Sequence, residues 1–210
     1  MSNNLSEHDA LLRRAQAGDE HALAELFARY RVRLRHMVHL RLDRRMSGRL
    51  DPSDVLQEAY LEIARRFPEY TANPTQPLFL WLRFLTGQKL IDLHRHHLGA
   101  KMRDVDQEVS LYRGALPPAS SESLAQQLLG RLTSPTHAAI RAEMQIQLQE
   151  ALNTMDPLDR EVLVLRHFEE LSNQEIAKVL GIGKTAASNR YIRALQRLRD
   201  ILDNYPGFLD

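Results

Sequence analysis

The sequence contains no cysteine among its 210 residues. This absence excludes disulfide bridges, thiolate metal sites and a cysteine nucleophile. Long apolar runs are also missing, because no uninterrupted stretch approaches the length that crosses a bilayer. The N-terminus is polar and acidic, unlike a signal peptide. We therefore expect a soluble protein of the cytoplasm.

The sequence patterns typical of enzymes are absent as well. There is no glycine-rich loop to hold a phosphate, no metal triad and no nucleophile motif. His94, His96 and His97 lie close together, but no acid or cysteine cluster accompanies them, and the same is true of His36 and His39. The sequence thus predicts a binding protein that is not an enzyme and that needs neither a metal nor a cofactor.

Charge is nearly balanced overall, with a net charge of +1, but it is strongly segregated along the chain. Residues 29–49 hold eight arginines and one acid, Asp43, whereas residues 51–70 hold five acids and two arginines. This segregation indicates partners of both signs. The sequence leaves open whether the arginine cluster contacts a nucleic acid or a protein, or is simply solvated.

Apolar residues recur at helical spacing throughout, so we predict an all-α fold. Asp51-Pro52 and Asp156-Pro157 each combine an N-cap with a proline in the first turn, which is a helix start signal. The prolines within Pro68–Pro77 predict a stiff, non-helical loop, because proline removes a backbone donor. The helix expected after this loop turns four apolar side chains inward, namely Leu78, Trp81, Leu82 and Leu85.

Helical periodicity fades between residues 104 and 136, where Pro117-Pro118-Ala119-Ser120-Ser121 marks a flexible linker. We predict two small helical domains, residues 1–103 and 137–210, joined by the linker 104–136. A short helix over Leu124–Leu132 is expected within this linker.

The second domain ends in a predicted helix-turn-helix. Ser172 and Glu175 form a capping box at the start of a short helix, and Gly181 supplies the turn that follows it. The next helix, from Lys184 to Arg199, has five basic residues and no acid. We expect its inward stripe to consist of Ile192, Leu195, Leu198 and Leu202.

A capped amphipathic helix with a basic outer face is often only solvated. Ordinary surface helices, however, mix charges of both signs, whereas this one has no acid before Asp200. Cations on an exposed helix that fits the major groove predict DNA binding.

These segments resemble a known family. Asp156–Ala177 and Arg190–Arg199 resemble the fourth conserved region of bacterial sigma factors. Asp51–Glu58, and Trp81–Asp92 with Arg95, resemble the second region. A chain with only these two regions and a linker is similar to the extracytoplasmic function (ECF) subfamily of bacterial RNA polymerase sigma factors. The sequence departs from the family at Gln88, usually asparagine, and at Ala186-Ala187, usually Thr-Val, so the promoter sequence cannot be copied from relatives.

The resemblance implies a sigma factor that directs promoter-specific transcription initiation by binding core polymerase and two promoter elements. Residues 1–103 would bind core and would recognise and melt the downstream element, whereas residues 137–210 would recognise the upstream element. An anti-sigma factor is a common partner in this family, although no residue here identifies one. The alternative is a helix-turn-helix transcriptional regulator of response-regulator type, whose front domain would be an α/β domain.

Individual site residues follow from the same resemblance. An acidic face, which could also be merely solvated, is expected to bind the polymerase core through Asp54, Gln57, Glu58 and Glu62. Downstream DNA contacts are expected from two places. In the proline-bounded loop, Tyr70 and Asn73 could hold a flipped base or be ordinary loop residues. The helix that follows contributes the basic Lys89, Arg95, His96 and His97. Upstream contacts are expected from Lys184, Thr185, Ser188, Asn189, Arg190 and Arg193. The two arginines are the leading candidates. Trp81 is expected to pack in the core rather than to act as a melting wedge.

Overall fold

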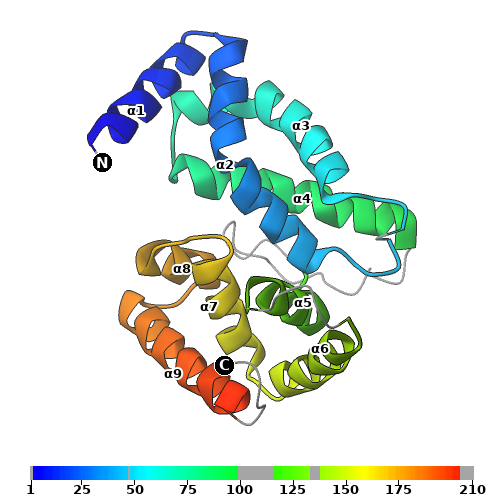
Figure 1. Ribbon diagram of the computed structural model, residues 1–210. Helices are drawn as coiled ribbons and strands as arrows, with labels where there is room; N and C mark the ends of the chain where they lie inside the picture. Colours follow the sequence, from blue (N-terminus) through cyan, green and yellow to red (C-terminus); the bar gives the residue numbers. More distant parts are fainter. Residues whose placement is uncertain (1, 47, 99–115, 133–137, 204–210) are drawn as a thin grey trace. The chain divides into compact units, whose positions relative to one another are not determined.

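The structure is a computed structural model that describes residues 2–46, 48–98, 116–132 and 138–203 (Figure 1). Every regular element in these ranges is an α-helix, which confirms the all-α prediction. The chain divides into two compact units, residues 1–38 with 42–116 and residues 39–41 with 117–210. The predicted domain boundaries at 103/104 and 136/137 lie outside the described residues.

The helices of the first unit are α1 (Ser2–Gln16), α2 (Glu20–Arg41), α3 (Pro52–Ala72) and α4 (Leu78–Leu98). The last residues of α2, 39–41, are assigned to the second unit. The helix starts follow the sequence signals. The Asp19 carboxylate accepts a hydrogen bond of 3.0 Å from the Ala22 amide and caps α2. Asp51 and Asp54 form a capping box around Pro52, which begins α3.

The core of this unit is built from large aliphatic side chains on three helices. Helices α3 and α4 pack against each other. Leu78, Leu82 and Leu85 of α4 are buried as predicted, and Trp81 is half-buried. The side chains buried most completely on α2, α3 and α4 are Leu26, Leu34, Met37, Leu56, Ile63, Leu82, Leu85 and Leu90.

The predicted loop over Pro68–Pro77 is wrong in its first half, because α3 continues through Pro68 to Ala72. Pro68 is exposed near the end of the helix, where the loss of one backbone hydrogen bond is tolerated more easily than in a buried interior. Phe67 is buried and Tyr70 stacks on Trp81, with ring centroids 4.6 Å apart and an interplanar angle of 24°. We infer that this aromatic packing outweighs the proline. The non-helical stretch is therefore limited to residues 73–77.

The second unit contains α5 (Ser121–Leu132), α6 (Ala138–Asn153), α7 (Pro157–His167), α8 (Asn173–Leu180) and α9 (Lys184–Asp203). Helices α5 and α6 pack together, and α9 packs against α6, α7 and α8 (Figure 1). The short helix predicted within the linker is thus present as α5. Its Leu124, Ala125 and Leu129 are buried in the same cluster as Leu148 and Phe168, so it belongs to the second unit rather than to a free linker.

The predicted inward stripe of α9 is wrong in its first half. Ile192 is 54% exposed and Leu195 is 37% exposed. The buried residues are instead Ala187, Ala194 and Ile201. Small alanines occupy the inward positions because α9 lies close to its neighbours there, and a search for large apolar residues overlooks them.

Candidate nucleic-acid and polymerase interfaces

The helix-turn-helix forms where the sequence predicts it. The Ser172 hydroxyl accepts from the Glu175 amide at 3.3 Å, and the Glu175 carboxylate accepts from the Ser172 amide at 2.8 Å. This reciprocal capping box satisfies backbone donors at the start of α8. Gly181 ends the helix in the left-handed conformation, with φ 64° and ψ 36°, which costs glycine little. The predicted motif is confirmed.

The N-terminal half of α9 presents an exposed polar face. Within the described residues, four of its predicted DNA contacts have exposed side chains that make no hydrogen bond or ion pair, namely Lys184, Thr185, Asn189 and Arg193. Such a face, on the second helix of this motif, can enter a major groove and donate hydrogen bonds to bases or phosphates.

The other two predicted contacts on α9 are engaged within the protein. The Ser188 hydroxyl accepts a hydrogen bond of 2.9 Å from the Asn173 amide group of α8. Arg190 Nη1 lies 2.8 Å from Asp159 Oδ1 and 3.7 Å from Asp156 Oδ1, at the start of α7. The sequence carries no signal for these pairs, because their members lie far apart in the chain and share no local pattern.

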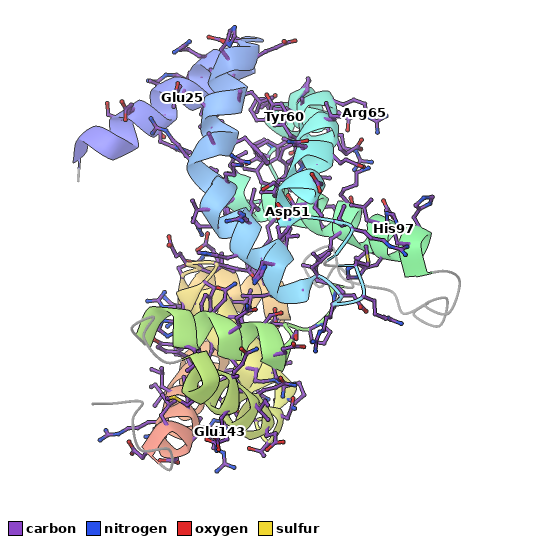
Figure 2. The ribbon with its side chains drawn as sticks, turned by 45° about the vertical axis from the view of Figure 1, so that its right-hand side comes forward. Glu25, Asp51, Tyr60, Arg65, His97 and Glu143 are labelled. Atoms are coloured by element: carbon purple, nitrogen blue, oxygen red, sulfur yellow. The ribbon has the colours of Figure 1, made fainter. Side chains whose placement is uncertain are left out.

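The predicted polymerase-binding residues lie at helical spacing on α3, and most of them also have intramolecular partners. Asp54, Gln57 and Glu58 are exposed. Asp54 accepts from the Asp51 amide at 2.9 Å, and Glu58 lies 3.1 Å from the Lys89 ammonium group. Glu62 pairs with two arginines that follow it on the helix; the hydrogen bond from Arg65, at 2.8 Å, is the main reason why the pKa of Glu62 is lowered. Arg65 points away from the bundle (Figure 2).

Tyr70 and Asn73 occupy different kinds of position. Tyr70 lies on α3, half-buried against Trp81, and its hydroxyl donates to the Gln76 carbonyl at 2.9 Å. Burial raises the pKa of Tyr70. Asn73 is exposed after the end of α3, and its amide donates to the Glu69 carbonyl at 3.3 Å. The tyrosine therefore holds the far end of the loop, whereas the asparagine side chain faces solvent.

The C-terminal part of α4 is basic and largely exposed. Arg95, His96 and His97 are exposed, and His97 is turned outward (Figure 2). His94 instead is buried, and its Nε2 accepts from the Asp43 amide at 3.4 Å. Burial lowers the pKa of His94. In the part of the chain that the structure describes, no three histidine, cysteine or acidic side chains are grouped to hold a metal.

The arginine cluster of residues 29–49 divides into distinct environments. Arg29 pairs with Glu7 at 3.0 Å, and the Arg33 guanidinium lies 3.6 Å from the centre of the Phe79 ring. Arg31 and Arg35 are exposed on α2, one turn apart. Part of the cluster thus stabilises the first unit, and part of it faces solvent.

Two further observations concern the class of the protein. Over the described ranges, none of the helices is both long enough and apolar enough to span a membrane. The described residues of the first unit are helical rather than α/β, which disfavours the regulator of response-regulator type. The fold and the exposed helix of the second unit define a helical, helix-turn-helix DNA-binding protein.

Comparison with known proteins narrows this class. The Sigma-70 region 4 family matches residues 145–198. The ECF RNA polymerase sigma factor SigD of Mycobacterium bovis is 29% identical over 192 residues, which are 91% of this chain and 82% of SigD. The sigma factor CarQ of Myxococcus xanthus is 26% identical over 91% of this chain and 95% of CarQ. The structure of CnrH in complex with the cytosolic domain of CnrY has a similar fold, with a TM-score of 0.54 and 22% identity over 93% of this chain and 97% of that chain.

These similarities support an ECF RNA polymerase sigma factor. Its function is that of a sigma factor, which acts with RNA polymerase to direct transcription initiation at promoters.

Proposed function

We propose that the two units divide the work of promoter recognition, as the predicted domains 1–103 and 137–210 imply. The second unit reads the upstream promoter element through α9. The first unit binds core polymerase through the acidic face of α3 and holds the downstream element with the loop after α3 and the basic end of α4. The single observation that carries this proposal is the exposed, acid-free face of α9 behind a tightly capped helix-turn-helix.

Upstream recognition is supported by charge and exposure. Lys184 and Arg193 have no acidic partner among the described residues, so their charges are available to phosphates or to guanine edges. Thr185 and Asn189 are exposed near the same end of α9 and can donate or accept hydrogen bonds. Because the exposed Ala186 replaces a larger side chain usual in the family, we expect a promoter preference specific to this chain.

Core binding is supported by the geometry of α3. Asp54, Gln57 and Glu58 are exposed three and four residues apart and therefore share one face. Glu62 extends this face by a further turn. A basic helical surface on the polymerase would complement it. The ion pair between Glu58 and Lys89 joins this face to α4, so core binding and DNA binding use neighbouring residues.

Downstream recognition is supported by the exposed groups around residues 73–77 and on the last turns of α4. Asn73 can hydrogen-bond an unstacked base, while Tyr70 fixes the loop from the side of the helix. We expect Arg95, His96 and His97 on the last turns of α4, and the half-buried Lys89 further back on the same helix, to meet phosphates, which are the main source of affinity in such contacts.

The same proposal covers partners and location. The chain acts in the cytoplasm by binding rather than by catalysis, and its partners are core polymerase and promoter DNA. CnrH, whose fold is similar, was solved in complex with the cytosolic domain of CnrY. We propose that a protein antagonist also binds this chain.

A charge reversal at Glu58 tests the role of α3. Glu58→Lys places a cation against the proposed basic surface of the polymerase and should weaken core binding about tenfold, which is about 1.4 kcal/mol. Asp54 is unsuitable, because its carboxylate closes the capping box of α3. Glu143→Lys is the matched control, since Glu143 is exposed on α6 in the other unit (Figure 2).

The measurement is the affinity of each full-length variant for purified core polymerase, with circular dichroism as the check on folding. Unchanged core affinity of Glu58→Lys, or an equal loss in Glu143→Lys, would contradict the proposed docking face.

A further inference from the structure

We propose that Arg190 positions the DNA-reading helix α9, through an ion pair with Asp159 and Asp156 of α7, instead of contacting DNA itself. This inference rests on the proposed function of α9 as the reader of the upstream element. It assigns to one of the two arginines predicted to read DNA a role that its position in the sequence does not reveal.

The geometry of the pair is well defined. Arg190 Nη1 lies 2.8 Å from Asp159 Oδ1, and the side chains are only 29% and 19% exposed. The same nitrogen lies 3.7 Å from Asp156 Oδ1. Asp156 is the N-cap of α7 and accepts from the Leu158 amide at 2.7 Å. Two carboxylates held at a helix N-terminus, where negative charge is favoured, thus face one guanidinium group.

Packing shows why α9 needs this tie. In the half of α9 proposed to face DNA, Ala187 is buried and Tyr191 is partly buried against the core cluster, while Ala194 is buried at the middle of the helix. The alanines have little apolar area to bury. The larger anchors, Leu198, Ile201 and Leu202, lie in the C-terminal half. Apolar packing of the N-terminal half therefore rests mainly on the Tyr191 ring, and the Arg190 ion pair adds a further link to α7.

Three polar contacts join this half to other helices, and one of them is between Tyr191 Oη and His167 Nε2 of α7, at 3.1 Å. Asn173 donates to the Ser188 hydroxyl at 2.9 Å and joins α9 to α8. Arg190, two residues further on, joins α9 to α7. Together they hold the exposed Lys184, Asn189 and Arg193 in one orientation relative to the rest of the unit.

The ion pair also affects how an alanine scan would be interpreted. Arg190→Ala would leave Asp156 and Asp159 without their cation beside the DNA-facing helix, where they would repel phosphates. The variant would lose DNA affinity, and this loss would be mistaken for the loss of a direct contact between Arg190 and DNA. Arg193 has no acidic partner among the described residues and serves as the matched comparison.

The test is a double-mutant cycle of Arg190→Ala and Asp159→Asn in the full-length chain bound to core polymerase. The probe is a duplex promoter fragment on which wild-type holoenzyme initiates, and affinity is measured over a series of salt concentrations. We expect each single variant to lose about fivefold in affinity. The double variant should be no weaker than Arg190→Ala and should keep the wild-type salt slope.

Arg193→Ala should behave differently. If Arg193 contacts one phosphate, its replacement should reduce the slope of log affinity against log salt concentration by about 0.9. The variant should also show no coupling to Asp159→Asn. The inference is overturned if Arg190→Ala lowers the slope by about 0.9 in the Asp159→Asn background while Asp159→Asn alone strengthens binding. Additive losses would overturn it as well. If Arg190→Ala fails to fold, Asp159→Asn alone decides: weaker binding supports the tie, and unchanged or stronger binding refutes it.

A footprint separates this inference from the function on which it rests. Protection of the upstream element by wild-type holoenzyme supports the role of α9, whatever the cycle shows. Its absence overturns that role and this inference together.

Discussion

Tyr70 offers the sharpest test of how the downstream site is organised. Its hydroxyl donates to the Gln76 carbonyl at 2.9 Å, and its ring stacks on Trp81 at 4.6 Å. Tyr70→Phe removes only the hydrogen bond, whereas Tyr70→Ala removes the hydrogen bond, the stack and the half-buried ring. The two variants therefore separate the tie to the loop from the aromatic packing.

The magnitudes follow from these contacts. A neutral hydrogen bond contributes about 0.5–1.5 kcal/mol net, so Tyr70→Phe should destabilise the first unit by about 1 kcal/mol. The stack adds about 0.5–1.5 kcal/mol beyond the buried area, so Tyr70→Ala should cost about 2–3 kcal/mol in total. Trp81 is the single tryptophan of the chain, and its fluorescence during urea unfolding reports on this unit.

Function is measured on the same variants by the permanganate reactivity of melted promoter DNA. If Tyr70 acts by holding the loop, Tyr70→Phe should reduce melting as well as stability. The reasoning is refuted if Tyr70→Phe leaves both the unfolding midpoint and promoter melting unchanged. Unchanged melting in Tyr70→Phe with complete loss in Tyr70→Ala would indicate that the ring itself stacks on a base.

Three further outcomes are expected. Gly181→Ala should destabilise the second unit by about 1 kcal/mol in thermal melts, because φ is +64° there; an unchanged midpoint would contradict the turn. Phe168→Ala should cost about 3–5 kcal/mol, since the side chain is fully buried, and should spare the Trp81 signal if the units fold separately. Burial lowers the pKa of His94 below 6.5, although Asp43 opposes this shift. The first unit should therefore be fully stable above about pH 6.5 and lose stability as the pH falls below it, and His94→Gln should flatten this dependence in urea titrations.

Local signals in the sequence were sufficient for most of the fold. Asp51-Pro52, Asp156-Pro157 and the Ser172–Glu175 capping box each lie where a helix begins, because capping depends on residues within one turn. Tertiary packing decided the rest. Helix α3 continues past Pro68 against Trp81, and α9 turns alanines rather than Ile192 inward.

The candidate sites were predictable in residue type but not in pairing. Exposure of Lys184, Asn189 and Arg193 agrees with a contact face deduced from charge alone. The partners of Arg190, Ser188 and Glu58 come from other helices, and no spacing within one helix indicates them. The DNA and polymerase contacts of all these residues stay predictions.

We expect this chain to give core polymerase its promoter specificity. The most direct measurement is in vitro transcription with purified core polymerase on fragments of the source genome, with start sites mapped at nucleotide resolution. We expect initiation at discrete promoters only when the chain is present, and loss of those starts when Arg193 is replaced by alanine. Specific DNA binding without core polymerase, together with no new start sites in its presence, would contradict it.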